Sequence, residues 1–557
     1  MCITEINSSF IVPAQDLDKP FKVEAGAGSG KTYWLINHIK NVSKLSTRLG
    51  KSRKILCITY TNNAVATIKN RLGSEITDVE IMTIHSFLYH HVVRPYCYLI
   101  AAEYGVNIQD LEGHDDRVLG YSSITEWLNL TNQTRTLRDR NDLINALKSL
   151  RWKYVDGSLT LKNSYYLKYL KTNSLFEYKK LAWQKGYIHH DDLLFFTYKI
   201  LEKIPFIATV IAAKFPYIFI DEFQDCNPIQ VHAVKKFAEK AIIGIIGDKA
   251  QSIYGFAGAE PKEFENFQLP NLQYYQMKEN RRSSNEIIDL LNHIRPSFPQ
   301  NKFKNESSSK PIIIVGQPLD AYNKVCELIK ASSIKTLAYQ NITTSSLREQ
   351  LNPDTTQNLM HLLESFDNNQ ERLRLIKTSI EAIALADSKN YKEALRKLSK
   401  LKLIRSDEDP RKLSLTWLAQ LTNYYHLNQN STLKDFAQFI KENLFFNLTK
   451  VTKGGVKNFY ESNNIKAIML WCSVEEDFRE HITIHKAKGD EFESVLFVLE
   501  NEKNLDFLLN PNLDSEPQRV SYVAVSRPKK NLFINTPTLS EENQQSLPLD
   551  LIEVLTI

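Results

Sequence analysis

The apolar residues of this chain gather in short uninterrupted runs, and long segments between them show helical spacing. Lys54–Tyr60, Tyr217–Ile220 and Ile242–Ile246 are nearly continuous apolar runs. A strand that is buried on both faces of a parallel sheet has such a sequence, because neither of its faces meets water. The runs therefore predict a parallel sheet covered by helices. Phe21–Val23 is placed to be a further, short strand of this sheet.

The segment from residue 91 to about 214 has a different character. It is rich in Tyr and Lys, it has helical spacing, and it contains no long apolar run. This shift in composition predicts a helical domain inserted after the first strands. A chain of 557 residues is also too long for a single hydrophobic core, so that two to four domains are expected.

A glycine-rich segment, residues 24–32, lies between the strand Phe21–Val23 and a helix-like stretch. Glycine is scarce in this chain, with 18 of 557 residues, yet three glycines fall within five positions here. Such a turn lets backbone N–H groups and a helix N-terminus face phosphate oxygens, while a lysine reaches the outer phosphates and a hydroxyl binds Mg²⁺. We therefore expect a nucleotide site formed by Gly26, Ala27, Gly28, Ser29, Gly30, Lys31 and Thr32.

Two adjacent carboxylates follow the apolar run Tyr217–Ile220. Asp221 is suited to hold Mg²⁺ together with Thr32, and Glu222 is suited to polarise the attacking water. The next run, Ile242–Ile246, leads to Gln251, whose neutral amide can sense a terminal phosphate by hydrogen bonding. Tyr254 and Phe256 follow at once and offer platforms on which bases could stack. The sequence thus predicts nucleotide hydrolysis close to a nucleic-acid site.

Other candidate contacts with nucleic acid are less specific. Thr59–Ala64 and Met82–Phe87 each combine small polar donors with an aromatic residue, which suits gripping a phosphate backbone, although an aromatic residue at a strand end more often serves packing. Lys40–Lys54 has six basic residues and no acidic one. We interpret it as a solvated loop, with a phosphate-contacting patch as the alternative.

Composition sets broad limits on the class of protein. The net charge of +6 permits a polyanionic partner without requiring one. Six scattered cysteines without a Cys-x-x-Cys pair favour free thiols in a reducing compartment. There is neither a leader-like N-terminus nor an apolar run of about 18 residues. We therefore expect a cytoplasmic protein without a membrane partner.

The motifs, taken in order, resemble those of superfamily 1 DNA helicases of the UvrD, Rep and PcrA type. Besides the glycine-rich loop and Asp221–Asp225, the resemblance includes Glu279–Ser283, Ile482–Phe492 and Tyr522–Lys530. These motifs occur in family order from residue 25 to residue 532, so that the resemblance spans nearly the whole chain.

The resemblance implies an α/β fold of two RecA-like parallel-sheet domains, each with a mainly helical insertion, and ATP bound between them. Ile312–Val315, Thr336–Asn341, Val495–Leu499 and Leu532–Ile534 fit strands of the second such domain. We expect the first RecA-like domain at residues 1–90 and 215–275, its insertion at 91–214, the second RecA-like domain at 276–345 and 476–557, and its insertion at 346–475.

Roles for further residues also follow from the resemblance. Arg282 and Arg527 would be arginine fingers that act on the transferring phosphoryl group, alongside Glu222 and Gln251, and Glu491 would contact the ribose. The implied cofactors are ATP and Mg²⁺, and the implied partner is single-stranded or tailed DNA. The DNA groove would be lined by Thr61, His85, Tyr254, Phe256, Thr483 and His485.

The chain departs from the family pattern at several positions. The upstream glutamine that reads adenine has no counterpart, because Gln15 lies too close to the loop, and Arg281 replaces an aromatic residue. Ala25, Ala257 and Asp490 replace a glycine, an arginine and a hydrophobic residue. The resemblance implies an ATP-dependent DNA translocase or helicase moving 3′ to 5′. The alternative is a DNA-sensing ATPase that regulates a partner, as in bacterial anti-phage systems such as Gabija, in which a separate nuclease subunit acts beside it.

Overall fold

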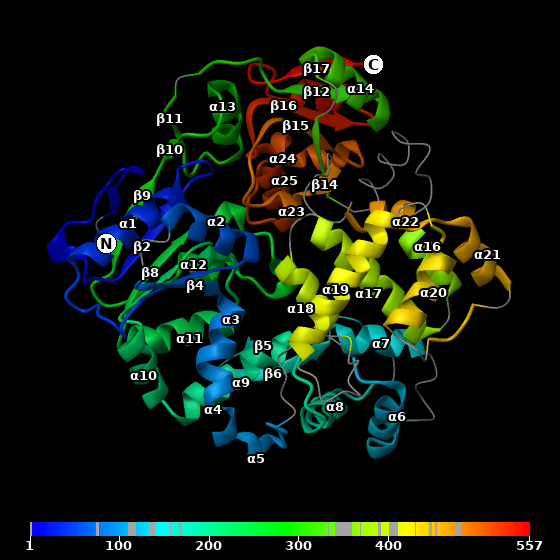
Figure 1. Ribbon diagram of the computed structural model, residues 1–557. Helices are drawn as coiled ribbons and strands as arrows, with labels where there is room; N and C mark the ends of the chain where they lie inside the picture. Colours follow the sequence, from blue (N-terminus) through cyan, green and yellow to red (C-terminus); the bar gives the residue numbers. More distant parts are fainter. Residues whose placement is uncertain are drawn as a thin grey trace. The chain divides into compact units, whose positions relative to one another are not determined.

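The computed structural model describes most of the chain, and its internal contacts divide it into two compact units (Figure 1). Unit 1 comprises residues 1–316 and 484–557, and unit 2 comprises residues 317–483. The described residues are 3–73, 77–109, 118–133, 140–155, 157–163, 165, 170–304, 306–331, 334–339, 359–367, 369–387, 391–399, 401, 410–428, 431–444, 448–451, 454–473 and 481–557.

Unit 1 contains a seven-stranded parallel sheet with the strand order β1-β9-β2-β8-β7-β3-β4. The strands are β1 (Ile3–Glu5), β2 (Phe21–Ala25), β3 (Ile55–Thr59), β4 (Val79–Thr83), β7 (Tyr217–Ile220), β8 (Ile242–Gly247) and β9 (Gln273–Met277). The four predicted strands, β2, β3, β7 and β8, are adjacent and almost wholly buried. β1, β4 and β9 are more exposed, and their sequences therefore lack the continuous apolar runs that marked the others.

This strand order brings distant parts of the sequence to one edge of the sheet. The carboxyl ends of parallel strands meet at the same edge, where ligands of α/β proteins bind. β2 leads to the glycine-rich turn and then to α1 (Lys31–Leu45), and Asp221 directly follows β7. Tyr60 directly follows β3, ahead of α2 (Asn62–Leu72), and Asp248 directly follows β8. The sheet thus positions most of the predicted site.

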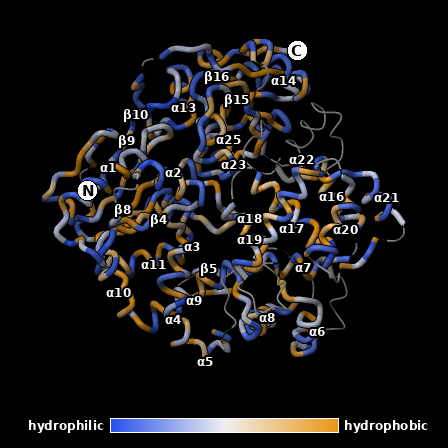
Figure 2. The backbone as a smooth tube through the Cα atoms, in the orientation of Figure 1, coloured by the Kyte–Doolittle hydropathy of each residue, from blue (hydrophilic) through white to orange (hydrophobic). Residues whose placement is uncertain are grey.

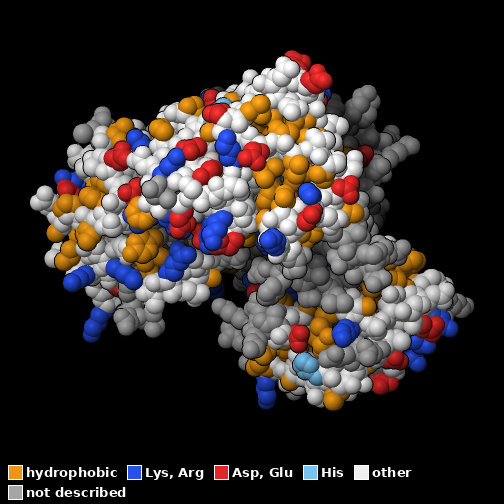
Figure 3. All heavy atoms as spheres, turned by 90° about the horizontal axis from the view of Figure 1, so that it is seen from above, with side chains coloured by type: hydrophobic (Ala, Val, Ile, Leu, Met, Phe, Trp, Pro, Cys, Tyr) orange, Lys and Arg blue, Asp and Glu red, His pale blue; other side chains and the backbone are white. Residues whose placement is uncertain are grey.

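The basic segment Lys40–Lys54 is only partly the solvated loop that was predicted. Its first part belongs to α1, which continues to Leu45. In the remainder, Arg48 pairs with Asp18 and Lys54 pairs with Glu80, so that part of the positive charge is already neutralised. On the face that Figure 3 shows, Lys and Arg side chains likewise lie among Asp and Glu side chains, in keeping with the small net charge.

The first insertion is mainly helical, as predicted, but it also contains an antiparallel hairpin of β5 (Leu150–Val155) and β6 (Ser158–Asn163). In β5 the buried Leu150 and Trp152 alternate with the more exposed Arg151 and Lys153, so that no apolar run forms. α3 (Ile84–Leu88) precedes this segment. Its own helices are α4 (Arg94–Tyr96), α5 (Ala101–Tyr104), α6 (Tyr121–Leu130), α7 (Arg140–Lys148), α8 (Thr172–Gln184), α9 (His190–Lys203) and α10 (Phe206–Lys214).

The rest of unit 1 supplies a second group of parallel strands, in the order β15-β16-β12-β17. They are β12 (Ile312–Val315), β15 (Phe492–Val498), β16 (Pro528–Thr536) and β17 (Glu553–Thr556), and they confirm three of the predicted strands. The other elements are α11 (Pro228–Ala238), α12 (Pro261–Glu265), β10 (Glu279–Asn280), α13 (Asn285–Ile294), β11 (Asn301–Lys302), α23 (Ile484–Ala487), α24 (Asp506–Leu509), α25 (Glu516–Val525) and α26 (Glu541–Ser546).

Unit 2 is largely helical and has its own hydrophobic core. Its elements are α14 (Pro318–Ile329), β13 (Lys335–Ala338), α16 (Leu359–Phe366), α17 (Gln370–Asp387), α18 (Tyr391–Ser399), α19 (Pro410–Leu427), α20 (Leu433–Asn443), α21 (Gly454–Ser462), α22 (Ile465–Ser473) and β14 (His481–Thr483). β13 and β14 are parallel, and β13 confirms the first part of the predicted strand at 336–341, whose last two residues lie outside the described residues. Orange and blue alternate along α17 to α20 in Figure 2, because one face of each helix is apolar.

The predicted fold class of parallel-sheet α/β domains with helical insertions is confirmed. The four-part division of the chain stays a prediction, and its boundaries at 345/346 and 475/476 lie outside the described residues. No helix among the described residues is both long and apolar enough to cross a membrane.

His38 on α1 is a buried polar residue in the core beneath the first sheet. Its ring stacks on Trp34 and contacts Phe21 and Phe219. Neither ring nitrogen has a hydrogen-bond partner in the described part of the chain. Burial lowers the pKa of His38 to about 3 from its ordinary value of 6.5, so that the folded protein holds this histidine neutral.

Replacement of His38 should make unit 1 less sensitive to acid. Below pH 6.5 the unfolded chain binds a proton at His38 that the folded chain rejects, so stability falls as pH falls, by roughly 2 kcal/mol at pH 5. The melting temperature of His38→Leu should therefore drop less between pH 7.5 and pH 5 than that of the wild type. His426→Gln, at an exposed histidine, is the control and should follow the wild type. Parallel pH profiles for His38→Leu and the wild type would contradict this assignment.

Candidate functional site

The turn between β2 and α1 has a backbone conformation that explains its glycines. Gly28 and Gly30 have φ angles of 70° and 83°, in the left-handed region that glycine adopts without strain. At Gly26 an added Cβ would lie 2.3 Å from Gln300 Nε2, which is far inside van der Waals contact. The turn therefore requires all three glycines, and it ends at the N-terminus of α1, where anions are favoured.

Polar groups of this turn fit a phosphate and a divalent cation. Ser29 Oγ and Lys31 Nζ are buried and have no hydrogen-bond partner in the part of the chain that the structure describes. Lys31 Nζ lies 3.6 Å from Glu222 Oε1, which is an ion-pair distance. Thr32 Oγ1 donates a hydrogen bond of 3.4 Å to Asp221 Oδ2. Buried donors without a hydrogen-bond partner suit phosphate oxygens, and a hydroxyl beside a carboxylate suits Mg²⁺.

Asp221 and Glu222 are adjacent in sequence but differ in proton affinity. Burial and the negative charge of Glu222 raise the pKa of Asp221 well above its ordinary value. Burial also acts to raise the pKa of Glu222, but the charges of Lys31 and Lys488 outweigh it and the pKa is lowered. Glu222 is thus an ionised carboxylate that can accept a hydrogen bond from water, whereas the environment of Asp221 favours a cation beside it.

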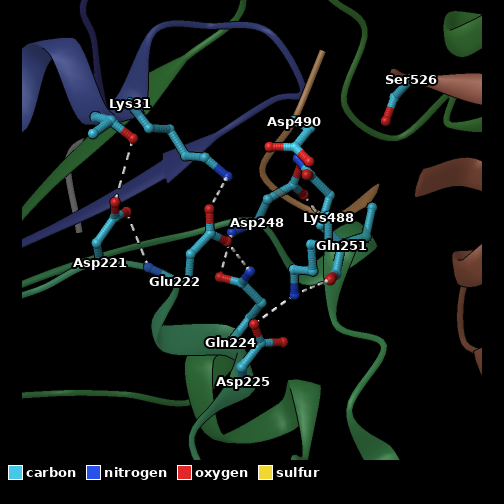
Figure 4. A network of polar contacts seen from close by, with 12 residues as sticks. Lys31, Asp221, Glu222, Gln224, Asp225, Asp248, Gln251, Lys488, Asp490 and Ser526 are labelled. Atoms are coloured by element: carbon cyan, nitrogen blue, oxygen red, sulfur yellow. Dashed lines mark hydrogen bonds and ion pairs between the residues drawn. The ribbon is translucent and has the colours of Figure 1, made fainter. Parts of the chain in front are cut away.

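Glu222 is held in an uncommon backbone conformation by its neighbours. Its φ angle of 54° lies in the left-handed region, which residues other than glycine rarely adopt. Its N–H donates to Asp221 Oδ1 at 3.0 Å, and Gln224 Nε2 donates to its carboxylate. Gln224 Oε1 accepts a hydrogen bond of 3.0 Å from Asp248 N. In Figure 4 the Gln224 amide contacts both Glu222 and Asp248, so the orientation of the Glu222 carboxylate is fixed by residues that follow the neighbouring strands β7 and β8.

Arg282 and Arg527 lie close enough to influence each other's ionisation. Arg527 is buried, and its Nη2 donates a hydrogen bond of 2.9 Å to Gln251 Oε1. Arg282 Nη1 donates one of 2.9 Å to the carbonyl oxygen of Ser526. Burial and the charge of Arg282 lower the pKa of Arg527 to about 9, and burial also lowers the pKa of Arg282. A buried guanidinium group and a largely shielded one that repel each other favour a polyanion as their ligand.

Glu491 forms ion pairs with Arg282 and Lys529. Glu491 lies 3.1 Å from Arg282 Nε and 3.2 Å from Lys529 Nζ, and its side chain is 49% exposed. The predicted ribose contact of Glu491 stays a prediction. Arg281 is held differently, because its guanidinium group pairs with Glu279 and lies 3.7 Å above the ring centre of Phe303.

Lys488, for which the sequence suggested no role, joins the nucleotide site to the aromatic residues. Its Nζ pairs with Asp225 Oδ2 at 2.5 Å and donates a hydrogen bond of 2.8 Å to the carbonyl oxygen of Gln251. The same group lies 4.7 Å from the ring centre of Tyr254. Lys488 is part of a motif that the resemblance had marked, but its sequence position gives no indication that it reaches Asp225.

Tyr60, Tyr254, Phe256 and His485 form an aromatic cluster next to this site. The Tyr60 and Tyr254 rings stack with centres 4.9 Å apart. Phe256 lies 5.8 Å from Tyr254 and 5.6 Å from His485, and its side chain is 70% exposed. An exposed aromatic edge of this kind can stack on a nucleobase. Tyr60, directly after β3, also belongs to the cluster. It is the aromatic residue of the candidate segment Thr59–Ala64, although the resemblance did not place it in the groove.

The other predicted groove residues are less directly connected. Thr61 follows Tyr60 and caps α2, where its Oγ1 accepts a hydrogen bond of 3.2 Å from Ala64 N. The ring of His85 lies 6.0 Å from that of His190 on α9. Thr483 ends β14 in unit 2. The structure therefore brings Tyr254, Phe256 and His485 together, and the DNA contacts of all six residues stay a prediction.

The parallel sheet, the glycine-rich turn and the paired carboxylates define a P-loop nucleotide hydrolase. Comparison with known families narrows this class. The sequence profile of the UvrD/REP helicase N-terminal domain matches residues 8–271, and that of the UvrD-like helicase C-terminal domain matches residues 283–538. The chain therefore belongs to the UvrD-like helicase family, and it is an ATP-hydrolysing enzyme of the helicase type.

Individual relatives are distant. The ATP-dependent DNA helicase Rep of Buchnera aphidicola is 22% identical over 93% of this chain and 91% of its own length. The ATP-dependent DNA helicase PcrA of Bacillus subtilis is 28% identical, but the match covers 53% of this chain and 39% of PcrA. The Gabija protein GajB of Bacillus cereus is 28% identical over 49% of this chain and 46% of its own length.

If the aromatic cluster stacks on bases, Tyr254→Ala and Phe256→Ala should each weaken single-strand binding. The expected loss is about 1 to 3 kcal/mol, with little change in sequence preference, because every base offers a π face. Fluorescence titration with labelled oligonucleotides measures it. Phe206→Ala, at a similarly exposed phenylalanine on α10, is the matched control and should bind normally. Unchanged DNA affinity together with a lowered melting temperature would mean that the rings serve packing instead.

Proposed function

We propose that this protein is an ATP-dependent DNA translocase or helicase that moves 3′ to 5′ on single-stranded DNA. The observation that supports it most directly is the short distance along the chain between the two sites. Gln251 contacts Arg527 in the nucleotide site, and Tyr254, only three residues later, stacks in the aromatic cluster. Lys488 contacts both ends of this segment. A movement of Gln251 at the phosphate site can therefore be transmitted to the aromatic cluster through the short segment 251–254 and through Lys488.

Each group of residues at the site has its own role in the proposed hydrolysis. In this proposal the turn at 26–30 and Lys31 bind the phosphates. Thr32 and Asp221 would hold Mg²⁺, which would offset the charge of the phosphate oxygens. Glu222, ionised and held by Gln224, orients the attacking water. Arg282 and Arg527 stabilise the charge on the transferring phosphoryl group. Glu491, now paired with Arg282, would turn to the ribose.

The proposed function predicts a specific response to DNA. ATP hydrolysis should rise with single-stranded DNA, and the protein should displace a strand from a duplex with a 3′ tail but not from one with a 5′ tail or from a blunt duplex. Strand displacement and phosphate release are measured on the same three substrates. Unwinding from the 5′ tail alone would contradict the proposed polarity.

Two variants separate binding from chemistry in this assay. Lys31→Ala should weaken nucleotide binding and turnover together, because it removes charge from the phosphate site. Glu222→Gln keeps the size of the side chain and should bind ATP normally while losing at least about a hundredfold in turnover. Near-normal turnover of Glu222→Gln would contradict its role as the residue that orients water.

A DNA-sensing ATPase subunit of an anti-phage complex is the second candidate function. The similarity to GajB favours it, as does Ala257, which stands where the family usually has an arginine in the DNA-contacting region. Such a subunit would hydrolyse ATP with DNA ends but unwind little, and it would act beside a separate nuclease. DNA-stimulated hydrolysis without strand displacement on any tailed substrate would favour this function over the first.

We identify few groups at the nucleotide site that could distinguish adenine from guanine. Arg281, which replaces an aromatic residue, is a planar group held between Glu279 and the Phe303 ring. A guanidinium plane can stack on guanine as readily as on adenine, and it offers only donors. Strong rejection of the wrong base requires polar groups that the wrong base leaves unpaired.

We therefore expect this protein to prefer ATP over GTP by less than roughly tenfold, or about 1.4 kcal/mol. DNA-stimulated kcat/KM is measured with both nucleotides. Arg281→Tyr should leave the ratio unchanged or sharpen it, whereas Arg282→Ala should abolish turnover with either nucleotide. A preference of a hundredfold or more would mean that other residues, in the stretch 10–22, read adenine.

A further inference from the structure

Asp248, at the end of β8, is a fully buried carboxylate that fixes the orientation of Gln251. Its Oδ2 accepts a hydrogen bond of 2.7 Å from Gln251 Nε2. A carboxylate can only accept and a guanidinium group can only donate. Gln251 must therefore turn its NH₂ group to Asp248 and its carbonyl oxygen to Arg527, which lies 2.9 Å away. Reversal of the amide would break both hydrogen bonds.

The charge of Asp248 is balanced by Arg295, which lies just after α13 and outside every motif that the sequence suggested. Arg295 Nη1 lies 2.7 Å from Asp248 Oδ1, and Arg295 Nη2 lies 3.3 Å from Glu24 Oε1. The side chain of Arg295 is only 2% exposed. A buried carboxylate without a counter-ion is strongly unfavourable, and Arg295 is the counter-ion that the structure places beside Asp248.

Asp248 also connects to the residue that is proposed to orient water. Its N–H donates to Gln224 Oε1, and Gln224 Nε2 donates to the Glu222 carboxylate. Figure 4 shows Asp248 and Gln224 next to Glu222. A displaced Asp248 would therefore disturb the carboxylate of Glu222 as well as the amide of Gln251.

We propose that Arg295 is a positioning residue for ATP hydrolysis. By balancing the charge of Asp248 it holds the Gln251 amide in the orientation that receives Arg527, and it does so without contacting the nucleotide. The proposal rests on the roles proposed above for Gln251 and Arg527. Arg295, directly after α13, thus joins the residues that are proposed to determine the rate of ATP hydrolysis.

Arg295→Met is the variant that tests this role. Arg295 borders a cavity of about 370 Å³ that Lys22, Glu24, Tyr274 and Phe298 also line. Alanine would let water from this cavity reach Asp248, whereas methionine fills much of the space and leaves the carboxylate uncompensated. We expect kcat of DNA-stimulated hydrolysis to fall by at least about 30-fold and KM for ATP to change less than about threefold, because the phosphates are bound elsewhere.

A second substitution should restore activity. Asp248→Asn removes the charge that Arg295 balances, and its amide oxygen can still accept a hydrogen bond from Gln251 Nε2. Only the 3.1 Å hydrogen bond that Ala250 N donates to Asp248 Oδ1 is given up. The double variant Asp248→Asn/Arg295→Met should therefore recover to within about fivefold of the wild-type kcat. If Arg295→Met fails to fold, this charge-balanced double variant decides the question. A folded double variant that stays about 30-fold slow would overturn the proposal.

A double-mutant cycle shows whether Arg295 acts through Gln251. In a Gln251→Ala background, Arg295→Met should lower kcat by less than about threefold further, because the group that it positions is already gone. If the double variant instead showed the full product of the two single effects on kcat, the proposal would be overturned.

Arg372→Met is the matched control. Arg372 in unit 2 is also a buried arginine that is paired with an aspartate, Asp367, and its loss should lower the melting temperature while kcat stays normal. A normal kcat in Arg295→Met, together with a strongly slowed but measurable Gln251→Ala, would overturn this inference alone. Normal turnover in Gln251→Ala and Arg527→Ala would instead overturn the roles on which it rests.

Discussion

The ion pair between Lys31 and Glu222, whose charged atoms lie 3.6 Å apart with both side chains mostly shielded from water, sets the electrostatics of the whole site. Lys31 helps to keep Glu222 ionised, and the charge of Glu222 in turn raises the pKa of Asp221 and acts on Arg527. Positive and negative groups are thus interleaved at low dielectric, where each strongly affects the others. A triphosphate and a divalent cation would enter a site whose charges already alternate.

The backbone of the glycine-rich turn depends on a second segment of unit 1 that lies against it. Gln300 Nε2 donates a hydrogen bond of 2.7 Å to the carbonyl oxygen of Ala27, and Arg281 N donates one of 2.9 Å to that of Gly28. Asn280 lies where a side chain at Gly28 would be. The glycines therefore serve two purposes: they allow the left-handed turn, and they leave room for the segment that carries Arg282.

Local features of the sequence were sufficient to predict much of the fold. β2, β3, β7 and β8 are buried on both faces, so each appears as an apolar run that is bounded by polar residues. The hairpin of β5 and β6 escaped prediction because its alternating pattern mixes basic and aromatic residues. β1, β4 and β9 lie at or near the edges of the sheet, where β1 is exposed and the other two are partly buried. Their sequences therefore show neither a continuous apolar run nor a clear alternation of apolar and polar residues.

By itself, the sequence determined the residues whose chemistry depends on neighbours in the chain: the glycine-rich turn with Lys31, the carboxylates after β7, and the family to which the chain belongs. Only the tertiary structure showed that Lys488 reaches Asp225 and that Arg295 balances Asp248. These pairs join residues far apart in the sequence, and either member alone resembles an ordinary surface charge. Their importance arises from burial, which makes a charge costly unless a partner is folded against it.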